Sequence, residues 1–360
     1  MHLSDFWIVV QWWGTLFLVG AVAFPLTKRL FSSWFDYGYL FSKAVGMAVV
    51  TYLVYLLGIL RVAPFNPGAV LSAMAAVFVG GIVLNMGDKV SRSEIPLRGR
   101  KWKIIIAEEI FFFAALLFWS WVKAHEPSIR GLEKFMDYGF MQSILNSFWF
   151  PAPDMWYAGF SINYYYFGHT VVAVLTKLSG IDLSYTFNLM LATIFALCLT
   201  MSFSIGKQIC QIGRIGRIGQ IAGGLMTAWL VTFAGNMQTL YAFTRGYTGE
   251  DMKPFWQLLW PTPLRQGFAG QAGEVWTNLL QGMNTYWYAN ATRFIPFSIH
   301  EFPSYSFVVS DVHGHVLSIP FVLLAIALVI QLAVNRKRLT VNRDEIILLV
   351  FYGLLVAILL

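Results

Sequence analysis

Residues Tyr185–Ile205 read YTFNLMLATIFALCLTMSFSI, a run without a single charged side chain. A helix needs about 20 apolar residues to cross the hydrocarbon core of a bilayer. The chain as a whole has the same character, with 58% hydrophobic residues, only 12% charged residues and a mean hydropathy of +0.62. Soluble domains are less apolar and carry about twice as much charge. The sequence therefore predicts an all-α, polytopic transmembrane protein.

Similar runs recur on both sides of this segment and predict about eight spans. The last run reaches the final residue without a polar tail, so we expect the chain to be the N-terminal part of a longer protein. The expected spans are Phe6–Phe24, Tyr39–Leu60, Ala69–Met86, Ile104–Val122, Tyr185–Ile205, Ile221–Phe243, Val316–Val334 and Ile346–Leu360.

The distribution of basic residues predicts the topology. The net charge is +7, but the lysines and arginines gather in breaks between alternate spans, and such breaks normally face the cytoplasm. This pattern predicts an integral protein of the cell membrane. Its N-terminus and its longer breaks, roughly 123–184 and 244–311, are expected on the outer side of that membrane. The charge pattern is typical of topology signals, and we expect no nucleic-acid partner. The basic residues are Lys28, Arg29 and Lys43, then Lys89 to Lys103, then Lys207, Arg214 and Arg217, then Arg336 to Arg343.

Two carboxylates stand four residues apart in the first outer segment. Glu133 and Asp137 would share one face of a helix. Paired acids near a membrane surface suit general-base catalysis or metal binding. Alternatively, they form a solvated acidic face paired with Lys134 and Arg130. Spacing alone favours the solvated acidic face.

An aromatic string, Asn163-Tyr-Tyr-Tyr-Phe-Gly-His169, follows in the same segment. We expect a helix over Ile162–Leu178 that is interfacial or re-entrant on the outer face, because a further crossing would move the later basic breaks outside. His169 follows Tyr165 by four residues and Tyr166 by three, so these side chains are expected on one side of that helix. The alternative is an aromatic belt at the lipid headgroups.

The second outer segment ends in a cluster of ligand-type residues. Asp311, His313 and His315 alternate, so they would point the same way on an extended chain. Two imidazoles and a carboxylate suit a divalent metal or a phosphate. Arg293 is suited to bidentate phosphate binding. The alternative is a capping aspartate with interfacial histidines.

Two further acids, Glu108 and Glu109, lie about one turn inside the fourth expected span. We expect them to pair with Lys101 and Lys103 at the inner membrane surface. A proton relay is the alternative, since ionisable residues within spans are often functional.

Several of these motifs together resemble one family, the "YYY" membrane proteins, a bacterial and archaeal domain of unknown function (number 2298). The resemblance covers roughly residues 100–330. The sequence departs from the family pattern at Phe135, His300 and Gly314. The matching motifs are Glu133-Lys-Phe-Met-Asp137, Pro153-Asp-Met-Trp-Tyr-Ala-Gly159, Ile162-Asn-Tyr-Tyr-Tyr-Phe-Gly-His169, His300-Glu-Phe-Pro303 and Asp311-x-His313-x-His315.

This family in turn resembles the GT-C glycosyltransferases, which use polyprenyl-phosphate-linked sugars on the outer side of a membrane. The resemblance implies a GT-C-like module over residues 101–360, truncated at its C-terminus, after a three-span addition over residues 1–100. It also implies an enzyme that binds membrane lipid and a lipid-linked sugar, with a divalent metal as an expected cofactor.

By this resemblance each candidate residue receives a role. Asp137 is the expected general base, and Glu133 is its partner or a metal ligand. The residues expected to bind substrate are Trp156, Tyr164, Tyr165, Tyr166, His169, Arg293 and Glu301, and those expected to hold a metal or the donor phosphate are Asp311, His313 and His315.

Two other functions remain open. A transporter or flippase of a lipid-linked or polar solute would favour broken helices and internal repeats. No repeat stands out, and the strongest polar clusters lie in the outer segments, which favours the enzyme. The third interpretation is a non-catalytic membrane scaffold.

Overall fold

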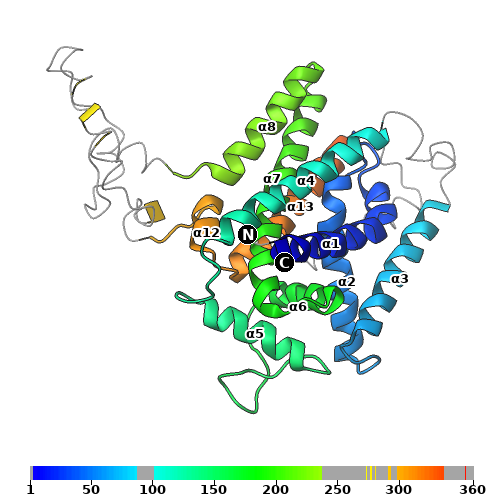
Figure 1. Ribbon diagram of the computed structural model, residues 1–360. Coiled ribbons are helices and arrows are strands. Elements are labelled where there is room, and N and C mark those ends of the chain that lie inside the picture. Colours follow the sequence, from blue (N-terminus) through cyan, green and yellow to red (C-terminus); the bar gives the residue numbers. More distant parts are fainter. Residues whose placement is uncertain are drawn as a thin grey trace. The chain divides into compact units, whose positions relative to one another are not determined.

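The computed structural model describes residues 3–86, 101–236 and 298–335, with isolated positions between 273 and 292 and at 353. Within these residues every regular element is helical (Figure 1). The elements are α1 (Leu3–Leu30), the short 3₁₀ helix η1 (Tyr39–Phe41), α2 (Ser42–Ile59), α3 (Pro67–Met86), α4 (Lys101–Lys123), α5 (Lys134–Asn146), α6 (Phe167–Ser179), α7 (Leu183–Ile212), α8 (Arg217–Phe233), α12 (Pro303–Val309) and α13 (Gly314–Asn335).

Six of these helices are long and apolar enough to cross a membrane: α1, α2 with η1, α3, α4, α7 and α13. They confirm the all-helical, membrane-spanning class. The expected count of eight is not confirmed. The expected span Ile221–Phe243 is observed as α8, whose 17 residues end at Phe233, and Ile346–Leu360 lies outside the described residues except for position 353.

The chain divides into two units, each described by itself. The first comprises Met1–Trp229 and Ser310–Leu360, and the second comprises Leu230–Val309. All six candidate spans and α5 and α6 belong to the first unit. The predicted boundary near residue 100 stays a prediction.

The centre of the first unit is α7. Nearly all of its apolar span is buried, and it packs against α4 and α13. The ring of Phe195 stacks on Trp119 of α4 with ring centroids 4.4 Å apart. Thr193 accepts a hydrogen bond of 2.8 Å from Trp12 Nε1 of α1. An unpaired polar group would be costly among these apolar side chains, so this bond fixes α1 against α7.

Small residues let α1 and α2 approach closely. A Cβ atom on Gly46 of α2 would lie 2.6 Å from the carbonyl oxygen of Val19 and 2.7 Å from its Cγ1 atom. Glycine at such a crossing is common between membrane helices, where close backbone contact replaces the hydrophobic driving force available in water.

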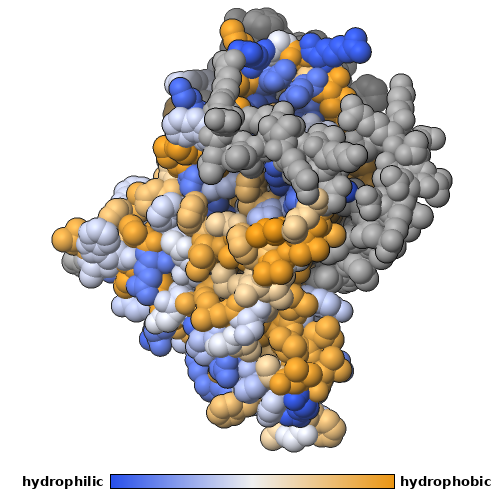
Figure 2. All heavy atoms as spheres, turned by 90° about the vertical axis from the view of Figure 1, so that its right-hand side faces the viewer, coloured by the Kyte–Doolittle hydropathy of each residue, from blue (hydrophilic) through white to orange (hydrophobic). Residues whose placement is uncertain are grey.

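The outer side of α3 is apolar. Leu71, Phe78, Val79 and Val83 are all more than one-third exposed. Figure 2 shows hydrophobic residues gathered on the face where α3 lies in Figure 1. Exposed apolar side chains at this density are typical of a lipid-facing surface.

One basic residue does not belong to a solvated break. Lys43, grouped above with the inner basic residues, is buried at the start of α2 and forms an ion pair with Glu109 of α4. The expectation that Glu109 pairs with Lys101 or Lys103 was therefore wrong. Lys43 comes from another helix, whose crossing brings it beside α4.

We predict that Gly46→Ala weakens the first unit, because the added methyl group would overlap the backbone of α1. Overpacking of this kind costs about 1–3 kcal/mol. Gly80→Ala on α3 is the matched control, since nothing lies within 4 Å of its added Cβ. Thermal unfolding in detergent should show a lower transition for Gly46→Ala only. Equal transitions for both variants would contradict the close α1–α2 contact.

Candidate functional site

The carboxylate of Asp137 is the centre of a polar cluster. It lies in the first turn of α5 and is 0% exposed. Its Oδ1 atom accepts hydrogen bonds from His169 Nε2 at 2.7 Å and from His313 Nδ1 at 3.2 Å. His169 and His313 follow Asp137 by 32 and 176 positions in the chain, and the fold brings all three together. We call Asp137, His169 and His313 the Asp137 centre.

Three helices begin at this centre. Asp137 is in the first turn of α5, and His169 is the third residue of α6. His313 immediately precedes α13, and its carbonyl oxygen accepts the backbone N–H groups of Val316 and Leu317. The peptide dipoles at helix N-termini favour nearby negative charge. Convergence of three N-termini therefore favours the ionised form of Asp137.

The local pKa shifts agree with an ionised aspartate. Burial by itself would raise the pKa of Asp137, but hydrogen bonds from His169 and His313, together with their charges, lower it overall. The hydrogen bond to Asp137 raises the pKa of His313, outweighing the opposing effect of burial. His313 therefore holds its proton to higher pH than a free histidine does.

A second group of side chains connects this centre to the surface. Glu133 Oε2 lies 3.2 Å from His313 Nδ1, and the Glu133 side chain is 60% exposed. On the other side of the ring, His313 Nε2 lies 3.1 Å from the Tyr164 hydroxyl, which donates to the Tyr165 hydroxyl at 2.9 Å. The rings of Tyr164 and Tyr165 stack with centroids 4.0 Å apart.

Asp311 is the second titratable carboxylate of the region. Burial, and next the negative charge of Asp137, raise its pKa to about 6. His313 and Lys134 act in the opposite direction. Asp311 therefore binds a proton more strongly than its neighbour Asp137 does. Two carboxylates with different proton affinities are common in acid–base sites.

The three tyrosines do not share a helix. The helix expected over Ile162–Leu178 is observed as α6, which begins at Phe167, so the predicted common side of Tyr165, Tyr166 and His169 was wrong. Tyr166 turns instead to Tyr55 of α2, with hydroxyl oxygens 3.1 Å apart. The eight residues from His169 to Thr176 are all buried. Thus α6 packs inside the bundle instead of lying along its surface.

The alternative of a solvated acidic face was wrong for Asp137, which is fully buried, whereas Glu133 is exposed. Sequence reasoning missed the pairing of Asp137 with His169 and the contact of Tyr166 with Tyr55. Both depend on the packing of α5 and α2 against α6, and helical spacing within one segment carries no signal for them.

The other predicted residues lie elsewhere. Trp156 is 68% exposed in the loop before α6, where its backbone N–H donates to Asp154 Oδ1 at 2.8 Å. His315 is exposed in the first turn of α13, with its ring centroid 5.5 Å from that of His313. Glu301 belongs to the second unit, where Ser306 Oγ donates to it at 3.5 Å. Arg293 lies outside the described residues.

The arrangement does not fit a metal ion. In the described part of the chain no group of three or more His, Cys, Asp or Glu residues is placed to hold one. Both ring nitrogens of His313 already engage protein groups, Asp137 on one side and Tyr164 on the other. The predicted metal set Asp311, His313 and His315 stays a prediction, and no chemical step is derived from it.

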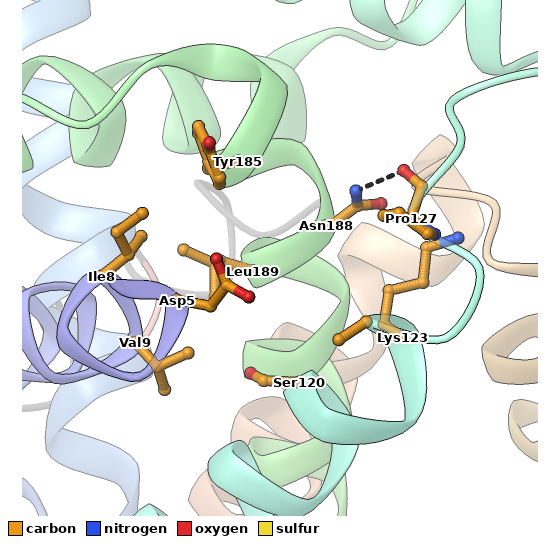
Figure 3. Close-up of a pocket in the computed structure, with 10 residues that line it drawn as sticks. Asp5, Ile8, Val9, Ser120, Lys123, Pro127, Tyr185, Asn188 and Leu189 are labelled. Carbon is orange, nitrogen blue, oxygen red and sulfur yellow. Dashed lines mark hydrogen bonds between the residues drawn. The ribbon is translucent and has the colours of Figure 1, made fainter. Parts of the chain in front are cut away.

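A pocket of about 220 Å³ lies near this region, between the first turns of α1, the end of α4 and the start of α7. Figure 3 shows Asp5 and Lys123 on two sides of it, with Asn188 hydrogen-bonded to the carbonyl oxygen of Pro127. The charge of Lys134 acts both on Lys123, which lines this pocket, and on Asp311.

Comparison with known proteins identifies the family. The chain belongs to the uncharacterized membrane protein family DUF2298, which matches residues 49–360. The match begins within α2, so it extends well beyond the motifs from which the resemblance was drawn. No curated protein and no solved structure matches the chain.

We predict that His313 titrates above its ordinary pKa of 6.5 and that Asp137→Asn lowers its pKa. The amide removes the charge that stabilises the imidazolium, while the burial that opposes it remains. Histidine NMR of the labelled protein in nanodiscs measures both titrations, with His313→Gln assigning the signal. Glu126→Gln, at an exposed carboxylate outside the centre, is the control. An unchanged His313 titration in Asp137→Asn would contradict the pairing.

Proposed function

We propose that this protein is a membrane glycosyltransferase that moves a sugar from a polyprenyl-phosphate-linked donor to an acceptor on the outer face of the membrane. The observation that carries the proposal is the Asp137 centre. A buried carboxylate is held ionised by two histidines from distant segments, beside the half-buried ring of Tyr164 and the exposed ring of Tyr165. Perturbed carboxylate–histidine groups of this kind are typical of acid–base catalysis.

The chemistry assigns a role to each side of the centre. Asp137 Oδ2 is buried and has no hydrogen-bond partner among the described residues, and we assign to it the proton of an acceptor hydroxyl. As that proton moves to Asp137, the acceptor oxygen forms a bond to the anomeric carbon of the sugar. The bond between that carbon and the phosphate oxygen breaks, and the polyprenyl phosphate leaves with the electron pair.

Positive charge beside the leaving group stabilises this transition state. His313 holds its proton more strongly than usual and stands between Asp137 and the tyrosines. A cation placed where the phosphate develops charge lowers the barrier. We assign a supporting role in phosphate binding to His315. Glu133, whose Oε2 atom lies 3.2 Å from His313 Nδ1, acts as the partner of Asp137.

Aromatic side chains supply surfaces for sugar rings. Tyr165 is 66% exposed and stacks on Tyr164, whose hydroxyl reaches His313. Rings with a polar tip combine an apolar face with a hydrogen-bonding edge. We propose that Tyr164 and Tyr165 form one wall of the substrate groove and Trp156 another. Tyr166, paired with Tyr55, positions the start of α6.

The positive-inside rule supports an outward-facing site. The Asp137 centre lies where α2 and α4 end and where α7 and α13 begin. The opposite ends carry Lys28 and Arg29 on α1 and the basic turn from Arg214 to Arg217 between α7 and α8. Basic residues at short breaks mark the cytoplasmic side.

Asp137→Asn is expected to lower sugar transfer by about 10²–10⁴-fold, the usual contribution of a general base. The assay follows loss of radiolabelled sugar from polyprenyl-phosphate-linked hexoses in nanodiscs containing the purified protein. Glu126→Gln should retain full activity. Circular dichroism and gel filtration check that Asp137→Asn is folded. Wild-type rates in Asp137→Asn would exclude Asp137 as the base.

The same purified protein, reconstituted in liposomes, distinguishes an enzyme from a carrier. In liposomes with the labelled lipid on one leaflet, a flippase would move the intact lipid across the bilayer without breaking the sugar–phosphate bond. Movement of intact lipid without sugar transfer to any acceptor would overturn the enzyme proposal.

Cysteine labelling tests the orientation independently. Ser128 is exposed in the segment between α4 and α5, whereas Cys210 lies near the end of α7. We expect an impermeant maleimide to label Ser128→Cys in a Cys210→Ser background on intact cells. The wild-type chain, with Cys210 in place, should be labelled only after permeabilisation. The reverse pattern would place the Asp137 centre in the cytoplasm.

A further inference from the structure

A second charged cluster, buried except for the half-buried Lys207, lies in the first unit at the opposite helix ends from the Asp137 centre. Asp36 precedes η1, and Lys43 is the second residue of α2. Glu108 and Glu109 are the eighth and ninth residues of α4, and Lys207 is near the end of α7. Burying charge in an apolar bundle is costly unless partners compensate it. We call these five residues the acid–lysine cluster.

Lys43 and Glu109 form an ion pair within the cluster. Lys43 Nζ donates to Glu109 Oε2, and so does the Tyr39 hydroxyl at 2.7 Å. Trp13 Nε1 donates to the other oxygen, Oε1, at 2.7 Å. Both oxygens of Glu109 are therefore satisfied, and its charge is balanced by Lys43.

Glu108 and Asp36 have carboxyl oxygens without a hydrogen-bond donor among the described residues. Glu108 is 4% exposed, and neither of its carboxyl oxygens receives a hydrogen bond from an N–H or O–H group of the described residues. Asp36 is fully buried and accepts the Gly38 N–H on Oδ1 at 2.9 Å, while its Oδ2 has no such donor. Asp36 and Glu108 lie within hydrogen-bonding reach of each other.

Two ionised carboxylates cannot form a hydrogen bond, because neither carries a hydrogen. A bond between Asp36 and Glu108 therefore requires one proton. Burial acts in the same direction, since it raises the pKa of Asp36 against the lowering effect of the Gly38 N–H group.

The net charge of the cluster also indicates one bound proton. Three carboxylates and two lysines, all ionised, carry a net charge of −1. The Lys207 ammonium lies 3.5 Å from the centroid of the Phe35 ring and interacts electrostatically with both Glu108 and Asp36. One added proton makes the cluster neutral, so that its five residues leave no unbalanced charge among the apolar helices.

We propose that Asp36 and Glu108 together bind one proton inside the bundle, forming a proton-binding site separate from the Asp137 centre. A sodium ion fits less well. The pair offers few free oxygens, whereas alkali and alkaline-earth cations take about six oxygen ligands, and the Lys207 ammonium would repel a metal cation. Loss of the proton would leave unbalanced negative charge where η1, α4 and α7 meet.

Infrared spectroscopy of the intact chain in nanodiscs tests the proposal directly. A protonated carboxylic acid has a C=O stretch that ionised carboxylates lack, and exchange into D₂O shifts it. The measurement is made at about pH 8, where Asp311, with a pKa of about 6, is ionised. We expect the band in the wild-type protein. Its absence would overturn the proposal whatever the variants show.

Two variants locate the proton. In Glu108→Gln or Asp36→Asn the new amide can donate to the remaining carboxylate, and the charges of the cluster sum to zero without a proton. We therefore expect the band to disappear in each. Glu126→Gln, at an exposed carboxylate, should keep it. Persistence of the band in either cluster variant would overturn the assignment, and circular dichroism confirms that each variant is folded.

Salt exchange distinguishes a proton from a metal cation. Replacing choline chloride with sodium chloride at constant pH should leave the band unchanged. Loss of the band on adding sodium would show that the pair binds sodium in place of the proton, and would overturn a proton-specific site.

Discussion

The hydrogen bonds of Asp137 with His169 and His313 are the constraint on which the arrangement of the candidate site depends. They join the first turn of α5, the first turn of α6 and the residue before α13 around one carboxylate oxygen. Without them a buried aspartate would stand among apolar side chains without compensation. With them, the same residue fixes where three helices begin and which way His313 faces. From His313 a chain of hydrogen bonds continues through the Tyr164 hydroxyl to the Tyr165 hydroxyl at the surface.

The same physical requirement explains the opposite end of the bundle. Each buried carboxylate of α4 there finds its partner in another segment: Glu109 pairs with Lys43 of α2, and Glu108 lies beside Asp36 in the turn before η1. Interhelical polar contacts are a principal source of specificity where both the surroundings and the competing surfaces are apolar. The two clusters differ in one respect. The Asp137 centre balances its carboxylate with imidazoles, whereas the second cluster has one carboxylate more than it has lysines.

Much of the fold could be predicted from composition and periodicity, because a run such as Tyr185–Ile205 has few alternatives to a membrane helix. The chemistry-bearing residues Asp137, His169 and His313 could also be named from their types and their apolar surroundings. Their contacts could not, because helical spacing relates only residues within one segment. Tyr166 illustrates the limit, since its partner Tyr55 lies 111 residues earlier in the chain. Lys43 illustrates the converse, because a lysine that counted as a topology signal proved to be an interior ion-pair partner.

The buried position of α7 has a consequence for biosynthesis. Two of its neighbours, α1 and α4, precede it in the chain, but α13 begins at Gly314, about one hundred residues after α7 ends. Until α13 has been synthesised, the face of α7 that contacts it must therefore be covered by lipid, a chaperone or another segment. His313 arrives with the same late helix, so Asp137 has only His169 as its imidazole partner until then. Completion of the core and assembly of the site are thus one event, and a ribosome that stalls before α13 leaves both unfinished.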